Sequence, residues 1–187
     1  MNKLKIIPYI FIIFFIVLTS ISGCINSTTD QEKNNIGEDF SFLGLDGFEK
    51  NLSDYRGQIV ILDMWATWCS PCGYQMLELE KVNNYYDAEI IEIISIDIDQ
   101  RETIMMVQEY IDEFQNNGIN LKWTFGMDVE QIWEKYKISG GIPTLYIFDE
   151  NGNIQYSHEG VSVFSEIPSG WPKNTITLKE KIDELIS

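Results

Sequence analysis

Two continuous apolar runs predict strands in the middle of a sheet. Residues 59–64 are apolar except for Asp63, and residues 90–96 are apolar except for Glu92 and Ser95. Strands buried on both faces have this composition, whereas a strand with one solvated face alternates apolar and polar residues. We therefore expect these two segments to be the central strands of the fold.

Two further segments have the pattern of hairpins. Residues 40–45 alternate in character and are followed by the turn sequence Asp46–Gly47, which predicts a hairpin at an edge of the sheet. Residues 145–148 and 154–156 are largely apolar and flank a turn at residues 149–152. They predict a strand–turn–strand unit near the end of the domain.

Apolar residues spaced three and four apart predict helices between and after these strands. One helix follows Cys69, and the last begins at the capping-box sequence of residues 177–180 and extends through Ile186. The positions that mark the other buried helix faces are Met76, Leu79, Val82 and Tyr86; Ile104, Val107, Ile111 and Phe114; and Val129, Ile132, Trp133 and Tyr136. Strands that alternate with helices and end in a hairpin and a helix predict an α/β sandwich with a mixed sheet.

The first 23 residues have the pattern of an export signal. Lys3 and Lys5 precede an apolar stretch at residues 6–18, and small and polar residues follow. The sequence Ile21-Ser22-Gly23-Cys24 resembles a bacterial lipobox, in which cleavage exposes a cysteine that receives lipid. We expect residues 1–23 to be a lipoprotein-type signal peptide and Cys24 to be lipidated. An uncleaved signal anchor is the alternative, because the apolar stretch approaches the length of a short membrane span.

The segment after the lipobox is polar and lacks apolar periodicity. Residues 24–38 are therefore expected to comprise the lipidated cysteine and a flexible tether. Residues 39–187 are expected to form the folded domain. With either kind of anchor, this domain would lie on the extracytoplasmic face of the cell membrane.

The composition narrows the choice of partners. The chain has 29 acidic and 13 basic residues and a formal net charge of −16. Affinity for phosphate backbones comes from Lys and Arg, so this charge argues against a nucleic-acid partner. It is typical of a soluble, self-repelling surface, and a specific basic partner is the alternative. Because no long apolar helix is left without a place in the core, we expect a monomer.

The strongest chemical signal is the pair Cys69 and Cys72, placed between a buried strand and a helix. A Cys-x-x-Cys pair in this position predicts redox chemistry, because the positive end of a helix favours a thiolate over a thiol. The chain has three cysteines, so lipidation of Cys24 would leave only this pair. A stabilising disulfide or half of a zinc site is the alternative. Zinc needs two more ligands and His158 is the only histidine, so we expect no metal and no cofactor.

Around this pair the chain resembles the thioredoxin superfamily, and more closely its exported TlpA/ResA-like branch. The resemblance rests on segments that follow the family's order from residue 39 to about residue 160. These segments are Asp39-Phe40 with Leu45-Asp46-Gly47, Leu52-Ser53-Asp54-Tyr55-Arg56-Gly57, Trp65-Ala66-Thr67-Trp68-Cys69-Ser70-Pro71-Cys72, Gly141-Ile142-Pro143-Thr144 and Asp149-Glu150-Asn151-Gly152. The resemblance implies a thioredoxin fold with a mixed sheet flanked by helices and a helical insertion after the second central strand, which residues 99–136 fit.

The resemblance also implies roles for the residues that carry the chemistry. Cys69 would attack a partner's disulfide, and Cys72 would resolve the mixed disulfide that results. Asp63 matches the acid that moves a proton to or from the resolving cysteine, and burial should raise its pKa. The alternative for Asp63 is a hydrogen-bonded strand acid without a chemical role. Gln75 stands where the branch often has Glu, so the pH tuning attributed to that Glu does not carry over.

The substrate groove is implied by the same resemblance. Pro143 matches the cis-proline that faces the cysteine pair, which would leave the Ile142 backbone free to pair with an extended partner segment. A trans proline that begins a strand is the alternative. Trp68 is the expected aromatic contact of the groove. Ser70 and Pro71 lie between the cysteines and are expected to line the groove. Their place between the two sulfurs should also affect the redox potential.

These observations predict a membrane-tethered thiol–disulfide oxidoreductase. The resemblance implies that it reduces protein disulfides, for example in haem-binding apocytochromes c or in envelope thiol homeostasis, and that a membrane thiol donor supplies its electrons. One alternative is a Cu(I)-binding module or metallochaperone that uses Cys69 and Cys72, because thiolates favour Cu(I). A thiol peroxidase is a further alternative, although the Thr/Arg setting of a peroxidatic cysteine is absent around Cys69.

Overall fold

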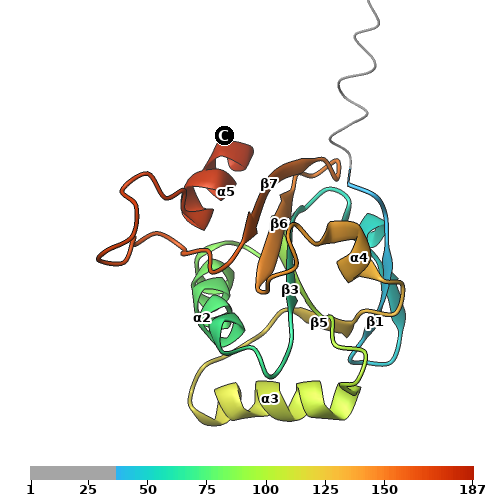
Figure 1. Cartoon of the computed structure of the whole chain (residues 1–187). Coiled ribbons are helices and arrows are strands. Elements are labelled where there is room, and N and C mark those ends of the chain that lie inside the picture. Colours follow the sequence, from blue (N-terminus) through green and yellow to red (C-terminus); the bar gives the residue numbers. More distant parts are fainter. Residues whose placement is uncertain (1–36) are drawn as a thin grey trace, which may run out of the picture. The chain divides into compact units, whose positions relative to one another are not determined.

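The computed structural model describes residues 37–187, and these residues form one mixed sheet with helices on both faces (Figure 1). The expected signal segment at residues 1–23, Cys24 and nearly all of the tether lie outside this range. The elements, in chain order, are β1 (Ser41–Gly44), β2 (Glu49–Asn51), the 3₁₀ helix η2 (Leu52–Tyr55), β3 (Ile59–Trp65), α2 (Ser70–Tyr85), β4 (Ile91–Asp97), α3 (Ile104–Asn116), β5 (Thr124–Met127), α4 (Ile132–Tyr136), β6 (Thr144–Phe148), β7 (Ile154–Glu159) and α5 (Leu178–Ile186). Among residues 37–187, no helix combines the length and the apolar character that crossing a membrane requires.

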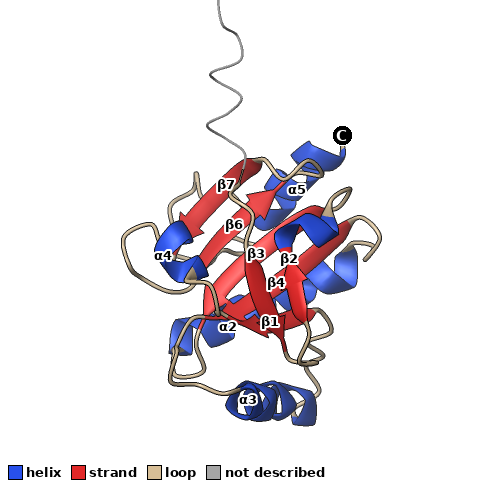
Figure 2. Cartoon of the chain, turned by 90° about the vertical axis from the view of Figure 1, so that its right-hand side faces the viewer, coloured by secondary structure: helices blue, strands red, loops and turns tan. Residues whose placement is uncertain are grey.

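The sheet has seven strands in the order β2-β1-β5-β4-β3-β6-β7 (Figure 2). β3 pairs in parallel with β4 and antiparallel with β6, so it lies in the middle. The hairpin predicted from residues 40–45 lies at one edge, and the hairpin β6–β7 forms the other. The expected mixed α/β architecture is confirmed, and so is the central place of the two apolar runs.

All seven residues of β3 are buried, and alternate side chains serve two different layers. Val60, Leu62 and Met64 pack in the core cluster that includes the buried residues of α4. Ile59 and Ile61 face the opposite layer, where α2 and α5 cover the sheet (Figure 1). Burying one such side chain contributes about 1.5–3 kcal/mol, so the continuous apolar run accounts for the placement of this strand.

The insertion after the second central strand contains a strand that the hydrophobic pattern did not predict. β5 follows α3, pairs in parallel with β4 and antiparallel with β1, and is only four residues long. Its Gly126 concealed it, because glycine is usually depleted in strands. A Cβ at this position would lie 2.4 Å from Cδ2 of Phe42, so the glycine permits close packing of β5 against β1.

The prediction that Val129 belongs to the buried face of a helix is wrong. Val129 is exposed and precedes α4, which begins at Ile132. The carboxylate of Asp128 accepts hydrogen bonds from the backbone N–H groups of Ile132 (2.8 Å) and Trp133 (3.0 Å). These bonds satisfy N–H groups that a helix leaves free at its start, so the position of the acid decides where the helix begins.

We predict that Gly126→Ala lowers the free energy of unfolding by about 1–3 kcal/mol, because the new methyl group cannot be accommodated without moving Phe42 and the carbonyl of Leu43. Urea unfolding of the oxidised protein measures this change. Glu49→Ala, an exposed position on the neighbouring hairpin, is the matched control and should change stability by less than about 0.5 kcal/mol. Equal stability of the two variants would contradict the packing argument.

Candidate redox site

The two cysteines lie where β3 passes into α2. They form a disulfide with a Cα–Cα distance of 5.3 Å, and both are buried, Cys72 completely. Cys69 is the N-cap of α2 and Pro71 stands in the first turn, where its missing N–H has no cost because that group would be free anyway. The strand thus delivers the pair to the positive end of a 16-residue helix.

The start of α2 places an N–H group on the sulfur of the first cysteine. The backbone N–H of Cys72 donates to Sγ of Cys69 at 3.2 Å. α2 has no acidic residue in its first turn, so no carboxylate there opposes a negative charge on that sulfur. Both features favour the thiolate of Cys69 in the reduced protein.

The loop before β6 faces the same sulfur. The Ile142–Pro143 peptide is cis, as the resemblance implied, and the carbonyl oxygen of Ile142 lies 3.7 Å from Sγ of Cys69. The carboxylate of Glu159 holds the preceding turn, since it accepts hydrogen bonds from the N–H groups of Ser139 (2.8 Å) and Gly140 (3.0 Å). Hydrogen bonds from the Ser139 hydroxyl and from these N–H groups lower the pKa of Glu159 to about 2. Glu159 is therefore ionised at neutral pH and holds this side of the site in place.

Asp63 lies in the middle of β3 and is fully buried. Burial raises the pKa of its carboxyl from the ordinary value of 3.8 to about 7, opposed in part by a hydrogen bond from the Ser95 hydroxyl, whose Oγ lies 3.0 Å from Oδ2. Its neighbours on the same face of the strand are Ile61, which packs with α2, and Trp65, which packs in one cluster with Cys72. An acid with this pKa can take up and release a proton near neutral pH.

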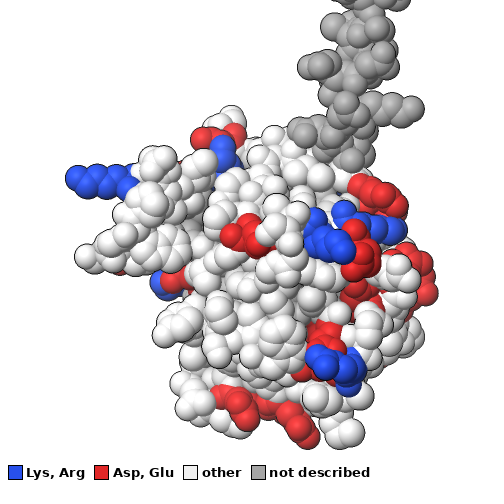
Figure 3. Space-filling view, viewed as in Figure 1, with Lys and Arg blue, Asp and Glu red and all other residues white. Residues whose placement is uncertain are grey.

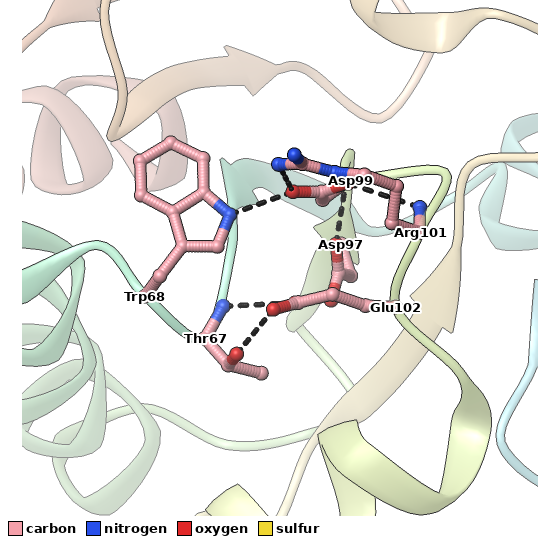
Figure 4. Close-up of polar contacts among 6 residues, drawn as sticks. All are labelled: Thr67, Trp68, Asp97, Asp99, Arg101 and Glu102. Carbon is pink, nitrogen blue, oxygen red and sulfur yellow. Dashed lines mark hydrogen bonds and ion pairs between the residues drawn. The ribbon is translucent and has the colours of Figure 1, made fainter.

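Carboxylates after β4 hold the loop that precedes Cys69 (Figure 4). The carboxylate of Glu102 accepts hydrogen bonds from the Thr67 hydroxyl and, at 3.0 Å, from the Thr67 N–H. Asp99, which is paired with Arg101, accepts the indole N–H of Trp68 at 2.7 Å. Thr67 and Trp68, the two residues before Cys69, are therefore held by the loop that follows β4.

Asp97 lies beneath this loop and is almost completely buried. Burial raises the pKa of its carboxyl to about 8, and the nearby Glu102 adds to the shift. Its Oδ1 accepts the N–H of Asp99 at 2.7 Å, which fixes the turn that carries the carboxylate bound to Trp68 (Figure 4). The Asp97 carboxyl therefore holds a proton more tightly than an exposed aspartate does.

Gln75 connects the helix to the loop after β7. It is fully buried, and its amide makes two hydrogen bonds with the backbone of Ser162, donating at 3.2 Å and accepting at 2.7 Å. Gly160, two residues earlier, donates its N–H to the carbonyl of Pro143 at 2.8 Å. Helix, loop and cis-proline are thus joined around the disulfide.

The structure brings most of the predicted site residues together. Cys69, Ser70, Pro71 and Cys72 open α2, Ile142 and Pro143 face the first sulfur, and Asp63 lies on the strand face under the helix. Trp68 is 61% exposed, whereas Trp65 is fully buried and packs against Tyr110 and Phe125.

Other residues of this region were not predicted from the sequence. Four polar side chains hold the site without belonging to its sequence motifs: Gln75, Ser95, Glu102 and Glu159. A signal existed for two of them. Ser95 interrupts a run of isoleucines, and Gln75 stands on the α2 face that also carries Cys72 and Met76.

His158 lies near the site on β7. It is partly exposed and stacks on Tyr156 with ring centroids 6.3 Å apart. Within residues 37–187, no group of three or more His, Cys, Asp or Glu side chains is placed to hold a metal ion. On the face shown in Figure 3, acidic groups gather along the right and lower margins, several of them beside a lysine or arginine.

Comparisons with known proteins agree with this geometry. The model of the AhpC/TSA family matches residues 34–157. The thiol-disulfide oxidoreductase ResA of Bacillus thuringiensis is 30% identical over 149 residues, which cover 74% of this chain and 82% of that protein. The thioredoxin-like protein YneN of Bacillus subtilis is 32% identical over 130 residues, covering 69% and 72%. Among solved structures, a Chlorobium tepidum protein assigned as the thiol:disulfide interchange protein DsbE has a TM-score of 0.65 at 23% identity and covers 82% of this chain and 96% of its own.

We predict that Asp63 makes the oxidised protein less stable as the pH rises. A carboxyl whose pKa is about 7 when folded and 3.8 otherwise holds its proton more tightly in the folded state. Stability should therefore fall between about pH 4 and pH 7 and stay low above it, by up to about 4 kcal/mol. Urea unfolding at pH 5 and pH 8 measures the loss, which Asp63→Asn should largely remove.

Asp97 should also make the folded protein less stable as the pH rises, because burial raises the pKa of its carboxyl as well. The comparison is therefore made in an Asp97→Asn background, in which the remaining pH dependence over this range is assigned to Asp63. A pH dependence that Asp63→Asn leaves unchanged would mean that this carboxyl is ionised in the folded protein at pH 5.

Proposed function

Since the chain belongs to the AhpC/TSA family and is a thioredoxin-like thiol–disulfide oxidoreductase, we propose that it reduces disulfides of other proteins through Cys69 and Cys72. The observation that carries the proposal is the disulfide itself. It lies at the N-terminus of α2, faces the cis Ile142–Pro143 peptide and has a buried acid on the strand beneath.

The first step uses the nucleophile at the helix start. In the reduced protein, the Cys69 thiolate attacks one sulfur of a partner disulfide. A bond forms between Cys69 and that sulfur, the partner's S–S bond breaks, and the partner's second sulfur leaves as a thiolate that takes a proton from solvent. The N–H of Cys72 and the positive end of α2 stabilise the attacking thiolate.

The second step releases the partner. The Cys72 thiol gives its proton to the Asp63 carboxylate, and the resulting thiolate attacks Sγ of Cys69. The Cys69–Cys72 disulfide forms, the mixed disulfide breaks and the partner leaves fully reduced. Two electrons have then passed from the cysteine pair to the partner. A thiol donor must return two electrons to the disulfide, after which the proton on Asp63 goes back to Cys72 and Cys69 is again a thiolate. We propose a membrane thiol donor for this step.

Partner recognition would use backbone and aromatic contacts. The Ile142 carbonyl beside the cysteine pair is available to an extended partner segment that adds as a strand. Trp68 is exposed at the mouth of the site, and Ser70 and Pro71 lie between the cysteines. We propose these four residues as the substrate-binding surface, with protein dithiols and disulfides, apocytochrome c among them, as partners. We further propose that the protein acts as a monomer.

We also propose that the domain is tethered to the extracytoplasmic face of the cell membrane. The proposal rests on the sequence alone: the apolar stretch at residues 6–18, the lipobox-like end at Cys24 and the polar segment after it. A lipid on Cys24 is the form of tether we favour over an uncleaved signal anchor. A reductant placed there would meet oxidised thiols, because disulfides form and persist outside the cytoplasm.

We predict that Cys72→Ser traps the partner, whereas Cys69→Ser does not react. Without the resolving thiol, the mixed disulfide on Cys69 should accumulate one to one, and turnover should fall to the rate of uncatalysed exchange. The measurement is non-reducing mass spectrometry after incubation of the detergent-solubilised full chain with insulin as the substrate. The reduction potential of the parental pair should lie near the value of about −270 mV typical of thioredoxin.

Other outcomes of these measurements contradict the proposal. A potential above about −180 mV, the value for protein disulfide isomerase, would make the protein an oxidant. Stoichiometric Cu(I) binding by the parental protein without disulfide exchange would assign the cysteine pair to metal binding. Equal trapping by Cys69→Ser and Cys72→Ser would remove the distinction between the attacking and the resolving cysteine.

We predict that Cys24→Ser prevents lipid attachment. The full chain expressed in a bacterial host with labelled palmitate should incorporate label, and the variant should not. The variant should also keep its unprocessed signal and a higher mass. Label in the Cys24→Ser variant would mean that lipid is attached at another residue. A parental protein that stays in the membrane uncleaved and unlabelled would indicate a signal anchor instead of a lipid.

A further inference from the structure

A chain of two hydrogen bonds leads from an indole to the buried acid. The indole N–H of Trp123 donates to Oγ of Ser95 at 3.0 Å, and the Ser95 hydroxyl donates to Oδ2 of Asp63 at 3.0 Å. Ser95 lies directly opposite Asp63 in the parallel pairing of β4 with β3. Trp123 immediately precedes β5 and stacks on Phe125 at a centroid distance of 5.3 Å.

The donors and acceptors in this chain fix its direction. An indole N–H can only donate, so Ser95 must receive it as an acceptor. The single hydrogen of the Ser95 hydroxyl is then left for Asp63, and no second acceptor for it is found among residues 37–187. Oδ2 of Asp63 is therefore occupied by a donor. Trp123 holds this donor in place through its own hydrogen bond to Ser95.

The other oxygen of the carboxylate has no protein partner. Asp63 is fully buried, and within the described residues its Oδ1 makes no hydrogen bond. A proton on Oδ2 would compete with the hydroxyl that already points at it, whereas a proton on Oδ1 displaces nothing. Cys72 packs in the cluster formed by Trp65, two residues along the same strand face.

We propose that Ser95 and Trp123 are positioning residues for the proton step at Cys72, because the Ser95 hydroxyl, oriented by the Trp123 indole, occupies Oδ2 of Asp63 and so directs proton uptake and release to Oδ1. The inference rests on the proposed function, in which Asp63 serves the resolving cysteine. During resolution the Cys72 S–H bond breaks and the proton joins Oδ1. The Cys72 thiolate then forms the S–S bond with Cys69 while the bond to the partner sulfur breaks. When the disulfide is reduced again, Oδ1 returns the proton to Cys72.

Among the polar groups around Asp63, the hydroxyl of Ser95 has the main effect on the pKa of the carboxyl. From α3, Tyr110 lies near enough for the negative charge of Asp63 to raise the pKa of its phenol, although burial is the larger cause. From α2, Cys72 is the titratable group on this side in the reduced protein. The β4 and β6 residues paired with Asp63 are Ser95 and Leu145, neither of which ionises. The influences on the pKa of Asp63 are burial and the bond from Ser95, with no cation among them.

The test compares Ser95→Ala, Trp123→Phe and the double variant with the parental full chain in detergent. A hydrogen bond to a charged group stabilises the charged form, so its loss in Ser95→Ala should move the titration of Asp63 upward by about one pH unit. Trp123→Phe should give a smaller shift in the same direction, because the Ser95 hydroxyl can then turn and accept a proton held on Oδ2. The double variant should match Ser95→Ala, since Trp123 acts through Ser95.

Two readouts separate this role from a loss of stability. One is the ¹³C carboxyl titration of Asp63 in the oxidised protein, and the other is the pH profile for reduction of bis(2-hydroxyethyl) disulfide by the reduced protein. Both should shift together. Trp133→Phe is the matched control, because Trp133 packs in the core cluster on the other face of the sheet, and it should shift neither readout.

An unchanged Asp63 titration in Ser95→Ala would overturn the proposal, and so would a double variant whose shift is the sum of the single shifts. A parental protein that leaves the small disulfide unreduced would overturn the proposed function instead. The carboxyl titration would still decide whether Ser95 and Trp123 control Asp63, because it needs no turnover.

Discussion

β3 and β4 run in parallel from the pair Ile59–Ile91 to the pair Trp65–Asp97, and both end at the same edge of the sheet. The chain leaves β3 to form the cysteine segment and leaves β4 to form the loop of Asp99 and Glu102. Parallel pairing therefore brings two segments more than 30 residues apart in sequence into hydrogen-bonding distance. It also places Ser95 opposite Asp63. Without this register, neither the loop before Cys69 nor the buried acid would have its partners.

Much of the fold could be predicted from apolar patterning, because burial on one or two faces dictates composition directly. The continuous runs of β3 and β4, the helix after Cys69 and the capping box at Thr177 all appeared in the structure as expected. β5 escaped because its stability comes from neighbours on both sides rather than from its own four residues. The pattern of a segment cannot show the partners that stabilise it.

The residues of the site likewise fall into those that the sequence could predict and those that it could not. Cys69, Cys72 and Pro143 belong to short motifs whose spacing carries chemical meaning, and they lie together in the structure. Gln75 and Glu159 act through partners 87 and 20 residues away, and such long-range hydrogen bonds have no signature in sequence spacing. The motifs therefore predicted residues that lie together at the disulfide, whereas the hydrogen bonds that hold these residues became visible only in the folded chain.

The bond between Gln75 and Ser162 has a consequence for how the protein responds to its surroundings. A carboxylate at this position would change its hydrogen-bonding ability whenever it gained or lost a proton, and the loop beside the cis-proline would change with it. An amide has no such transition over the physiological range. The contact between α2 and the loop after β7 thereby does not depend on pH, whereas the charge of Asp63 beneath the disulfide does. Under the proposed function, the loop beside the cis-proline would keep these hydrogen bonds in acidic and neutral surroundings, and the proton step at Asp63 would be the part of the cycle that responds to pH.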